Sequence, residues 1–260
     1  MLTRLLEHPL TRGLEIDSPD TTARRIELIR QKPFLRRIYE EWYRTLAGQL
    51  PHGSGQVVEL GSGAGFMKEF IPDLITSDVF PINGVDLVLS ADQLPFPDDS
   101  LRAVVMSNVF HHLSAPTRFL DEADRCVRPG GRVLMLEPWN TAWSRLIYTR
   151  LHHEPFAPDA PDWGFSGHGP LSDANGALPW IVLARDRQRF LAEYPRWSIR
   201  TLRPTMPFRY LASGGVSLRN LMPGWTFPIW KGVEACLSPF DWLLGMFAYI
   251  TLEKHDKVTN

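Results

Sequence analysis

The chain has 260 residues, of which 44% are hydrophobic and 22% charged, so it can bury a sizeable core. Its formal net charge of -1 provides no basic field, which excludes nucleic acid as a first hypothesis for a partner. Cys126 and Cys236 show no CxxC or Cys/His spacing, which favours a reducing, cytoplasmic setting and argues against zinc. Residues 1–15 lack the continuous apolar stretch of a secretory signal.

Two helices are expected before residue 50. Ser18 followed by Pro19 is a helix start, because serine caps free N–H groups and proline suits the first helical position. Pro33 begins a second helix. Apolar residues recur at every fourth position along it: Phe34, Ile38, Trp42 and Leu46. This spacing predicts one buried face packed against the rest of the domain.

From residue 56 onward, short apolar runs alternate with helical segments. Five runs predict strands, at residues 56–60, 74–77, 85–89, 103–107 and 132–136. Ser114 can cap a helix that leads into the fifth strand. Such alternation predicts a parallel sheet with helices on its faces.

The sequence ELGSGAG at residues 59–65 follows the first strand, at the sheet edge where such folds bind ligands. Gly61, Gly63 and Gly65 let the backbone approach a ligand closely. A helix beginning near Ala64 would add free N–H groups. Dinucleotide-binding folds favour GxGxxG, and Phe66 occupies the third glycine position here, which disfavours NAD.

Carboxylates stand on either side of this turn. Glu59 can anchor an amino group of a ligand. Asp78, near the end of the second strand, can accept both hydroxyls of a ribose. Asp86 is the competing carboxylate, because the sequence leaves the strand register open.

Four motifs follow one another along the chain: ELGSGAG (59–65), DQLPFPDDS (92–100), NVFHHL (108–113) and PGG (129–131). In this order they resemble the class I S-adenosylmethionine-dependent methyltransferases, specifically the UbiE-like, type 11 group. The resemblance covers about residues 56–138. It implies an α/β fold, a Rossmann-like, doubly wound, mostly parallel sheet of about seven strands with an antiparallel last strand.

The resemblance also implies which residues hold S-adenosylmethionine. They are Glu59, Gly61, Ser62, Gly63, Gly65, Asp78 or Asp86, Asp92, Gln93 and Asn108. The glycine turn would lie along the methionine and ribose, with Glu59 near the amino group. Asp92 and Gln93 would face the adenine, and Asn108 would lie beside the sulfonium. Leu94 and Phe96 would form wall and core.

The connection between the second and third strands departs from the family. Its members have a helix there, but only residues 79–84 remain, and a parallel crossover normally needs about a dozen residues. Either the helix is lost and the sheet edge rebuilt, or one of the two strands is wrong. Both Asp78 and Asp86 therefore stay candidates for the ribose.

Three histidines are candidate catalytic bases: His111, His112 and His168. Methyl transfer depends mostly on alignment, but an alcohol or an acidic carbon must also lose a proton, and imidazole titrates near neutrality. A structural hydrogen bond is the alternative for each histidine. The run His152, His153 and Glu154 shows no partner set, so no metal site is expected.

The expected organisation is a helical lid (1–50), a cofactor-binding core (51–140), a lid loop (141–180) and a part that completes the sheet (181–260). That last part would contain a helix at 180–194, a sixth strand at 197–202 and an antiparallel strand at 247–252. An aromatic-rich insertion at 207–245 separates the last two strands. It is expected to cap an acceptor pocket, with a dimer interface or a membrane contact as alternatives.

The sequence therefore predicts a methyltransferase that uses S-adenosylmethionine to methylate a small-molecule or lipid-like acceptor at oxygen or carbon. The rival hypothesis is a non-catalytic scaffold or regulatory partner that binds the same cofactor. A dehydrogenase is the weaker third hypothesis. The protein is expected in the cytoplasm, with peripheral membrane attachment left open.

Overall fold

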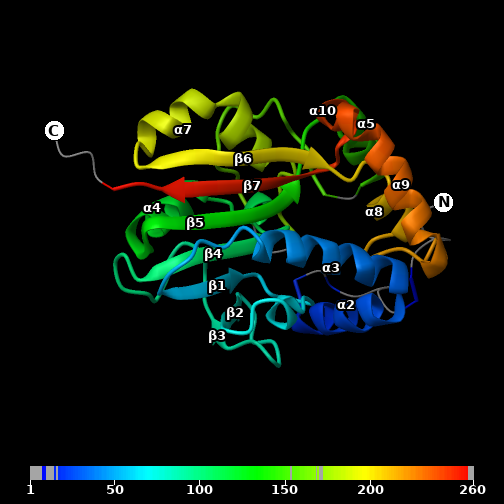
Figure 1. Ribbon diagram of the computed structural model, residues 1–260, viewed down its shortest axis with the longest axis horizontal. Coiled ribbons are helices and arrows are strands. Elements are labelled where there is room, and N and C mark those ends of the chain that lie inside the picture. The colour runs from blue at the N-terminus through cyan, green and yellow to red at the C-terminus, as the bar shows by residue number, and fades with distance from the viewer. Residues whose placement is uncertain are drawn as a thin grey trace.

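The computed structural model describes residues 8–9, 15, 17–152, 154–167, 169 and 172–256. Seven strands form one sheet in the order β3-β2-β1-β4-β5-β7-β6 (Figure 1). They are β1 (Gln56–Leu60), β2 (Leu74–Asp78), β3 (Leu87–Val88), β4 (Leu101–Ser107), β5 (Val127–Pro138), β6 (Trp197–Thr205) and β7 (Phe247–Lys254). All seven predicted strands are present.

Strands β1 to β5 pair in parallel, and β7 runs antiparallel to both β5 and β6. The predicted mixed sheet with an antiparallel last strand is confirmed. Strand β1 lies between β2 and β4, so the strand order reverses there. In doubly wound sheets, ligands bind beyond the carboxyl ends of the strands at this switch point.

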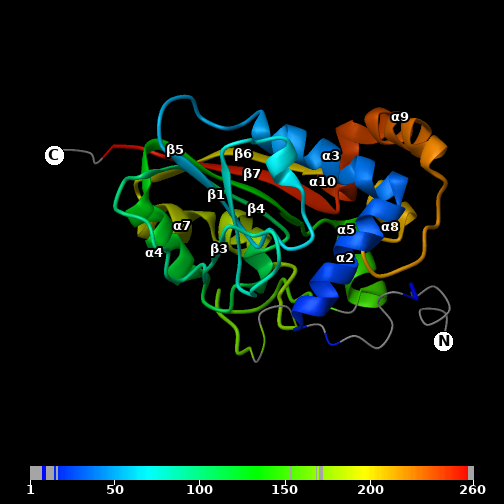
Figure 2. The same cartoon turned by 90° about the horizontal axis from the view of Figure 1, so that it is seen from below.

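Helices α2 (Pro19–Gln31) and α3 (Pro33–Ala47) precede the sheet. Ser18 caps α2 as predicted, because its hydroxyl oxygen accepts from the Asp20 amide at 3.2 Å. The predicted apolar face of α3 is confirmed, since Phe34, Ile38, Trp42 and Leu46 are fully buried. Figure 2 shows α3 on one side of the sheet and α4 and α7 on the other.

Helix α4 (Pro116–Cys126) joins β4 to β5, as predicted, but Ser114 does not cap it. Ala115 takes the N-cap position without a side-chain hydrogen bond, because Pro116 sets the helix start one residue later. The predicted helix at 180–194 is divided into α6 (Leu178–Trp180), a π-helix η3 (Ile181–Arg185) and α7 (Arg187–Glu193). Helix α5 (Ala142–Leu151) follows β5.

The two connections that flank β2 contain no α-helix. The helix expected from Ala64 is wrong, because residues 61–73 form only a 3₁₀ turn, η1 (Met67–Glu69). The glycine turn uses the first of these residues, and Pro72 cannot supply a helical N–H. Residues 79–86 join β2 directly to the two-residue β3, so the crossover helix is lost and the sheet edge is rebuilt.

The insertion between β6 and β7 is helical. It contains α8 (Arg209–Ser213), η4 (Gly224–Thr226), α9 (Phe227–Leu237), η5 (Ser238–Phe240) and α10 (Asp241–Leu244). Arg209 is buried and pairs with Glu234 of α9 and with Glu41 of α3, the latter at 2.8 Å. The Lys32 ammonium donates to the carbonyl of Gly215 at 2.6 Å. These contacts fix the insertion against the N-terminal helices.

None of the helices in the described residues has the length and apolar character needed to cross a bilayer.

Candidate active site

A cavity of about 1340 Å³ lies at the carboxyl ends of the central strands. Its wall includes the turn after β1, the ends of β2 and β4, and part of α2. The segment after α5 and the segment from residue 210 to 221 complete it. Residues from the first 25 positions and from the insertion therefore face the same space as the central turn.

The glycine turn after β1 is in a conformation that glycine favours. Gly61 has φ 63° and Gly63 has φ 44°, both in the left-handed region. A Cβ atom on Gly61 would lie 2.5 Å from Cγ2 of Val109. The close approach at Gly61 is thus to the turn after β4, so packing between the two turns already requires glycine there.

Asp78 lies in the cavity wall and is buried. Its carboxylate accepts hydrogen bonds from the Gly63 amide at 2.9 Å and from the Phe80 amide at 3.0 Å. Burial raises the pKa of Asp78, and these backbone hydrogen bonds oppose the rise. The carboxylate is thereby held against the glycine turn.

Asp86 is outside the set of residues that line the cavity. Its carboxylate accepts from the Lys68 ammonium at 2.8 Å and from the Thr76 amide at 2.8 Å. The hydrogen bond from Lys68 is the main reason why the pKa of Asp86 falls to about 2. Of the two carboxylates left open by the sequence, only Asp78 lines the cavity.

Glu59 projects from β1 into the same wall and is only 2% exposed. One of its carboxylate oxygens accepts from the Ser62 hydroxyl at 2.8 Å. Burial raises the pKa of Glu59 to about 7, since the Ser62 hydrogen bond offsets it only in part and the Asp78 charge adds to it. A buried carboxyl that is half-ionised near neutrality is well suited to pair with a cationic ligand group.

Of the two residues expected to face the adenine, one lines the cavity and the other does not. Asp92 is exposed and lines the cavity, whereas Gln93 is outside its wall. Leu94 and Phe96 are buried in the core as predicted, but neither forms part of the cavity wall. Asn108 lines the cavity. Its backbone φ is 58°, and its backbone N–H donates to the Leu136 carbonyl at 2.8 Å.

Glu137, at the end of β5, organises the turn that follows Asn108. Its fully buried carboxylate accepts from the amides of Val109 at 2.8 Å and Phe110 at 2.9 Å. The second oxygen lies 2.7 Å from Nδ1 of His111. Sequence reasoning did not select Glu137, although an ionisable residue at the end of an apolar strand was the available signal.

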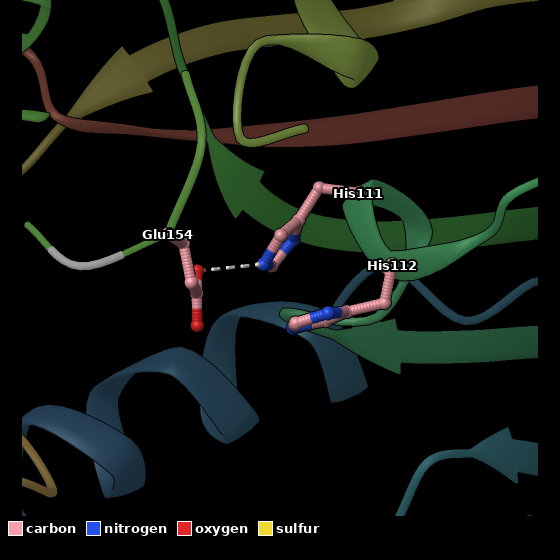
Figure 3. A group of neighbouring side chains, drawn as sticks. All are labelled: His111, His112 and Glu154. Carbon is pink, nitrogen blue, oxygen red and sulfur yellow. Dashed lines mark ion pairs between the residues drawn. The ribbon is translucent and has the colours of Figure 1, made fainter. Parts of the chain in front are cut away.

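His111 and His112 belong to the 3₁₀ turn η2 (Phe110–His112) and line the cavity. Figure 3 shows both rings directed toward Glu154, with Nε2 of His111 3.5 Å from its carboxylate. Nδ1 of His112 lies 3.0 Å from the carbonyl oxygen of Asp173. His168, the third candidate base, lies outside the described residues.

The two histidines differ in protonation. Burial lowers the pKa of His111, but Glu137 and Glu154 outweigh it and raise the pKa to about 9. For His112, burial and the neighbouring His111 lower the pKa to about 4. At neutral pH His111 holds its proton and His112 is a weak acceptor, so neither matches a base poised near the operating pH.

Residues 58–135 match the family model described as Methyltransferase domain. An uncharacterized methyltransferase of Mycobacterium tuberculosis is 30% identical over 115 residues, which are 39% of this chain and 46% of the relative. An uncharacterized methyltransferase of Mycolicibacterium vanbaalenii is 31% identical over 134 residues, 43% of this chain and 47% of the relative. The chain thus spans about half the length of the curated relatives it matches.

Two solved structures share the fold. One is from the complex between the Haloferax volcanii Trm112 methyltransferase activator and the putative methyltransferase, with a TM-score of 0.54, 15% identity, and coverage of 94% of this chain and 100% of that chain. The other is an S-adenosylmethionine-dependent methyltransferase from Archaeoglobus fulgidus, with a TM-score of 0.51, 14% identity, and coverage of 84% and 94%. At such identities the likeness establishes the fold alone. All four motifs lie within residues 58–135, the stretch that matches the methyltransferase-domain model.

Proposed function

We propose that this protein is an S-adenosylmethionine-dependent methyltransferase that acts on a small-molecule or lipid-like acceptor, at oxygen or carbon. The observation that supports this function best is the cavity at the strand switch point. There the glycine turn, Glu59 and Asp78 share one wall with Asn108, the buried His111 and the partly buried His112. Binding groups for a cofactor and polar groups for an acceptor thus face one space.

The residues of the turn fit this cofactor. Glu59 offers a buried carboxylate for an ammonium group, and Asp78 offers two oxygens for a ribose diol. When bound, S-adenosylmethionine supplies a methyl group on a positively charged sulfur. The chain has to orient the acceptor and exclude water, since such transfer depends mainly on alignment.

The remaining part of the cavity wall is rich in apolar and aromatic side chains. They are Tyr148, Phe156, Tyr210, Leu211, Met246 and Phe247. Apolar lining with a few polar groups is typical of small-molecule sites. This lining supports an acceptor with an apolar body.

Product formation separates the enzyme from the scaffold hypothesis. The protein is incubated with S-adenosylmethionine carrying a labelled methyl group, together with long-chain phenols and a bacterial total-lipid extract. We expect label in the organic phase with wild-type protein and none with Asp78→Ala. Tight cofactor binding without labelled product from any acceptor would favour the non-catalytic scaffold.

Cofactor binding should depend on pH through Glu59. We expect the affinity for S-adenosylhomocysteine to rise between pH 6 and pH 8, because Glu59, with a pKa of about 7, must lose its proton to pair with the ligand ammonium. Below that pKa the affinity should fall by up to about tenfold per pH unit. Calorimetric titrations across this range measure it. Glu59→Gln should bind weakly at every pH, and an equal pH dependence in both proteins would contradict the assignment.

A lipid-like acceptor is also consistent with an exposed apolar surface on the insertion, here called the apolar helical surface. Its residues are Trp225, Ile229, Val233, Phe240, Trp242 and Leu243. Trp225 is 71% and Trp242 69% exposed. The segment that precedes η4 lines the cavity through Val216, Leu218 and Leu221. We propose that this surface rests on a membrane, so that an acceptor can pass from lipid to the cavity.

Replacing both exposed tryptophans tests the membrane contact. Trp225→Ala/Trp242→Ala should reduce co-sedimentation with phosphatidylcholine vesicles by roughly tenfold or more, since each buried tryptophan contributes about 1.5–3 kcal/mol. Val88→Ala, at another exposed apolar position, is the matched control and should sediment like wild type. Equal sedimentation of all three proteins would contradict the proposed membrane contact of the apolar helical surface.

A further inference from the structure

Three side chains with metal-ligating atoms meet in the cavity from two distant segments. His111 and His112 come from the turn after β4, and Glu154 comes from the segment after α5 (Figure 3). One donor atom from each lies within 4.8 Å of the other two. The sequence run at 152–154 showed no partner set for Glu154, because its partners lie more than forty residues away in the chain.

We infer that His111, His112 and Glu154 form a binding site for a divalent transition-metal ion, and that zinc(II) is the ion this donor set favours. Two imidazole nitrogens and one carboxylate oxygen are a known ligand set for zinc. Magnesium and calcium prefer sites made only of oxygen atoms. The donor set thus excludes the hard cations as first choices.

Hydrogen bonds orient both imidazoles for ligation. Nδ1 of His111 lies 2.7 Å from the Glu137 carboxylate, and Nδ1 of His112 lies 3.0 Å from the Asp173 carbonyl oxygen. A carbonyl oxygen can only accept, so Nδ1 of His112 carries its hydrogen and Nε2 keeps a lone pair. Metal-binding histidines typically have such a carboxylate or carbonyl behind the ligating nitrogen.

The charges around His111 also favour a cation. Glu137 faces one ring nitrogen of His111, and Glu154 faces the other at 3.5 Å. His152 approaches Glu154 as well, with Nδ1 3.8 Å from its carboxylate. A metal ion at Nε2 of His111 would take the place of a proton between the imidazole and Glu154.

The three donors must move closer to bind an ion. Zinc ligands lie about 2.1 Å from the metal, which puts them roughly 3.4 Å apart in a tetrahedron. The widest separation, up to 4.8 Å, therefore has to close by up to about 1.4 Å. The carboxylate of Glu154, whose side chain is 19% exposed, already lies 3.5 Å from Nε2 of His111, so that pair needs almost no movement.

A site with three protein ligands keeps a further coordination position open. If the proposed function is right, an acceptor oxygen can occupy that position, because all three residues line the cavity that also contains Asn108. The ion would lower the pKa of the acceptor hydroxyl, whose proton would pass to solvent water, and would hold the oxygen as its anion. The inference thus deepens the proposed function, since neither histidine is suited to act as the base.

Metal titrations test the site without any acceptor. Chelator-treated wild-type protein is titrated with Zn²⁺ by calorimetry and with Co²⁺ by visible absorption. We expect one site per chain and a tetrahedral cobalt spectrum. His112→Ala and Glu154→Gln should each lower the Zn²⁺ affinity by roughly 100-fold. His255→Ala is the matched control, because the His255 ring lies against the Ser198 hydroxyl at 2.7 Å, outside the cavity wall, and the variant should bind Zn²⁺ like wild type.

S-adenosylhomocysteine titrations of the same samples show whether each variant is folded and keep the two proposals apart. Retained cofactor binding together with equal Zn²⁺ affinity in wild type, His112→Ala and Glu154→Gln would overturn the metal site alone. A wild-type protein that binds Zn²⁺ but not S-adenosylhomocysteine, together with weakened Zn²⁺ binding in His112→Ala and Glu154→Gln, would instead support the metal site and contradict the proposed function.

Discussion

Replacing Asp78 with alanine should weaken the affinity for S-adenosylhomocysteine by roughly 1,000-fold, because two charge-assisted hydrogen bonds to the ribose, each worth about 2 kcal/mol, are lost. Asp86→Ala should change the affinity by no more than about twofold, as expected for a residue outside the cavity. Calorimetric titration measures both. A severe loss in Asp86→Ala with normal binding in Asp78→Ala would show that the ribose lies elsewhere.

A conservative variant separates ribose binding from support of the glycine turn. The Asp78 carboxylate also accepts the Gly63 amide, so alanine removes both roles. Asp78→Asn keeps one acceptor oxygen for that amide but carries no charge. We expect Asp78→Asn to fold, to melt slightly below wild type because its NH₂ group faces the Phe80 amide, and to bind the ligand weakly. A purely structural role would leave its affinity normal.

Replacing Glu137 with alanine should lower the free energy of unfolding by about 3–5 kcal/mol, the usual cost of breaking a buried ion pair. The variant leaves two buried amides and the His111 imidazole without their carboxylate. Urea denaturation at pH 7, with a chelator present, measures this loss. Glu137→Gln keeps one acceptor oxygen and should lose less, so equal stability of wild type and Glu137→Ala would contradict the role of Glu137.

The contact between Glu137 and His111 should also make the free energy of unfolding depend on pH. The pKa of His111 is raised to about 9 in the folded protein, above the ordinary value of 6.5. Its contribution is therefore fully present below pH 6.5 and is lost as the pH rises through 9. Glu137→Gln should show a smaller decline over this window, and identical declines would show that other groups cause it.

The sequence predicted the element types well where the pattern is local. The every-fourth-residue stripe of α3 and the apolar runs of the strands identified these elements without tertiary information, because burial dictates both periods. The glycine turn was located by its motif directly after the first strand, and the carboxylates around it by their positions beside that turn. The loss of the crossover helices flanking β2 was predictable only in part. Residues 79–84 are too few for a parallel crossover with a helix, whereas residues 61–73 are numerous enough and yet form only η1.

The acceptor side of the site depends on contacts that the sequence could not show. Glu154 contacts His111 although 43 positions separate them in the sequence, and Glu137 contacts it from 26 positions away. These contacts depend on the order of the strands in the sheet and on the path of the segment after α5. No local sequence pattern encodes either of them. The lid roles of residues 1–50 and 141–180 stay predictions, although Thr21, Thr22 and Phe156 line the cavity.

The most direct measurement is a calorimetric titration of the purified protein with S-adenosylhomocysteine, with NAD as a control. The proposed function predicts one micromolar site for S-adenosylhomocysteine per chain and no binding of NAD. Tighter binding of NAD, or no binding of S-adenosylhomocysteine by protein that melts cooperatively, would contradict the assignment of the glycine turn, Glu59 and Asp78 to this cofactor.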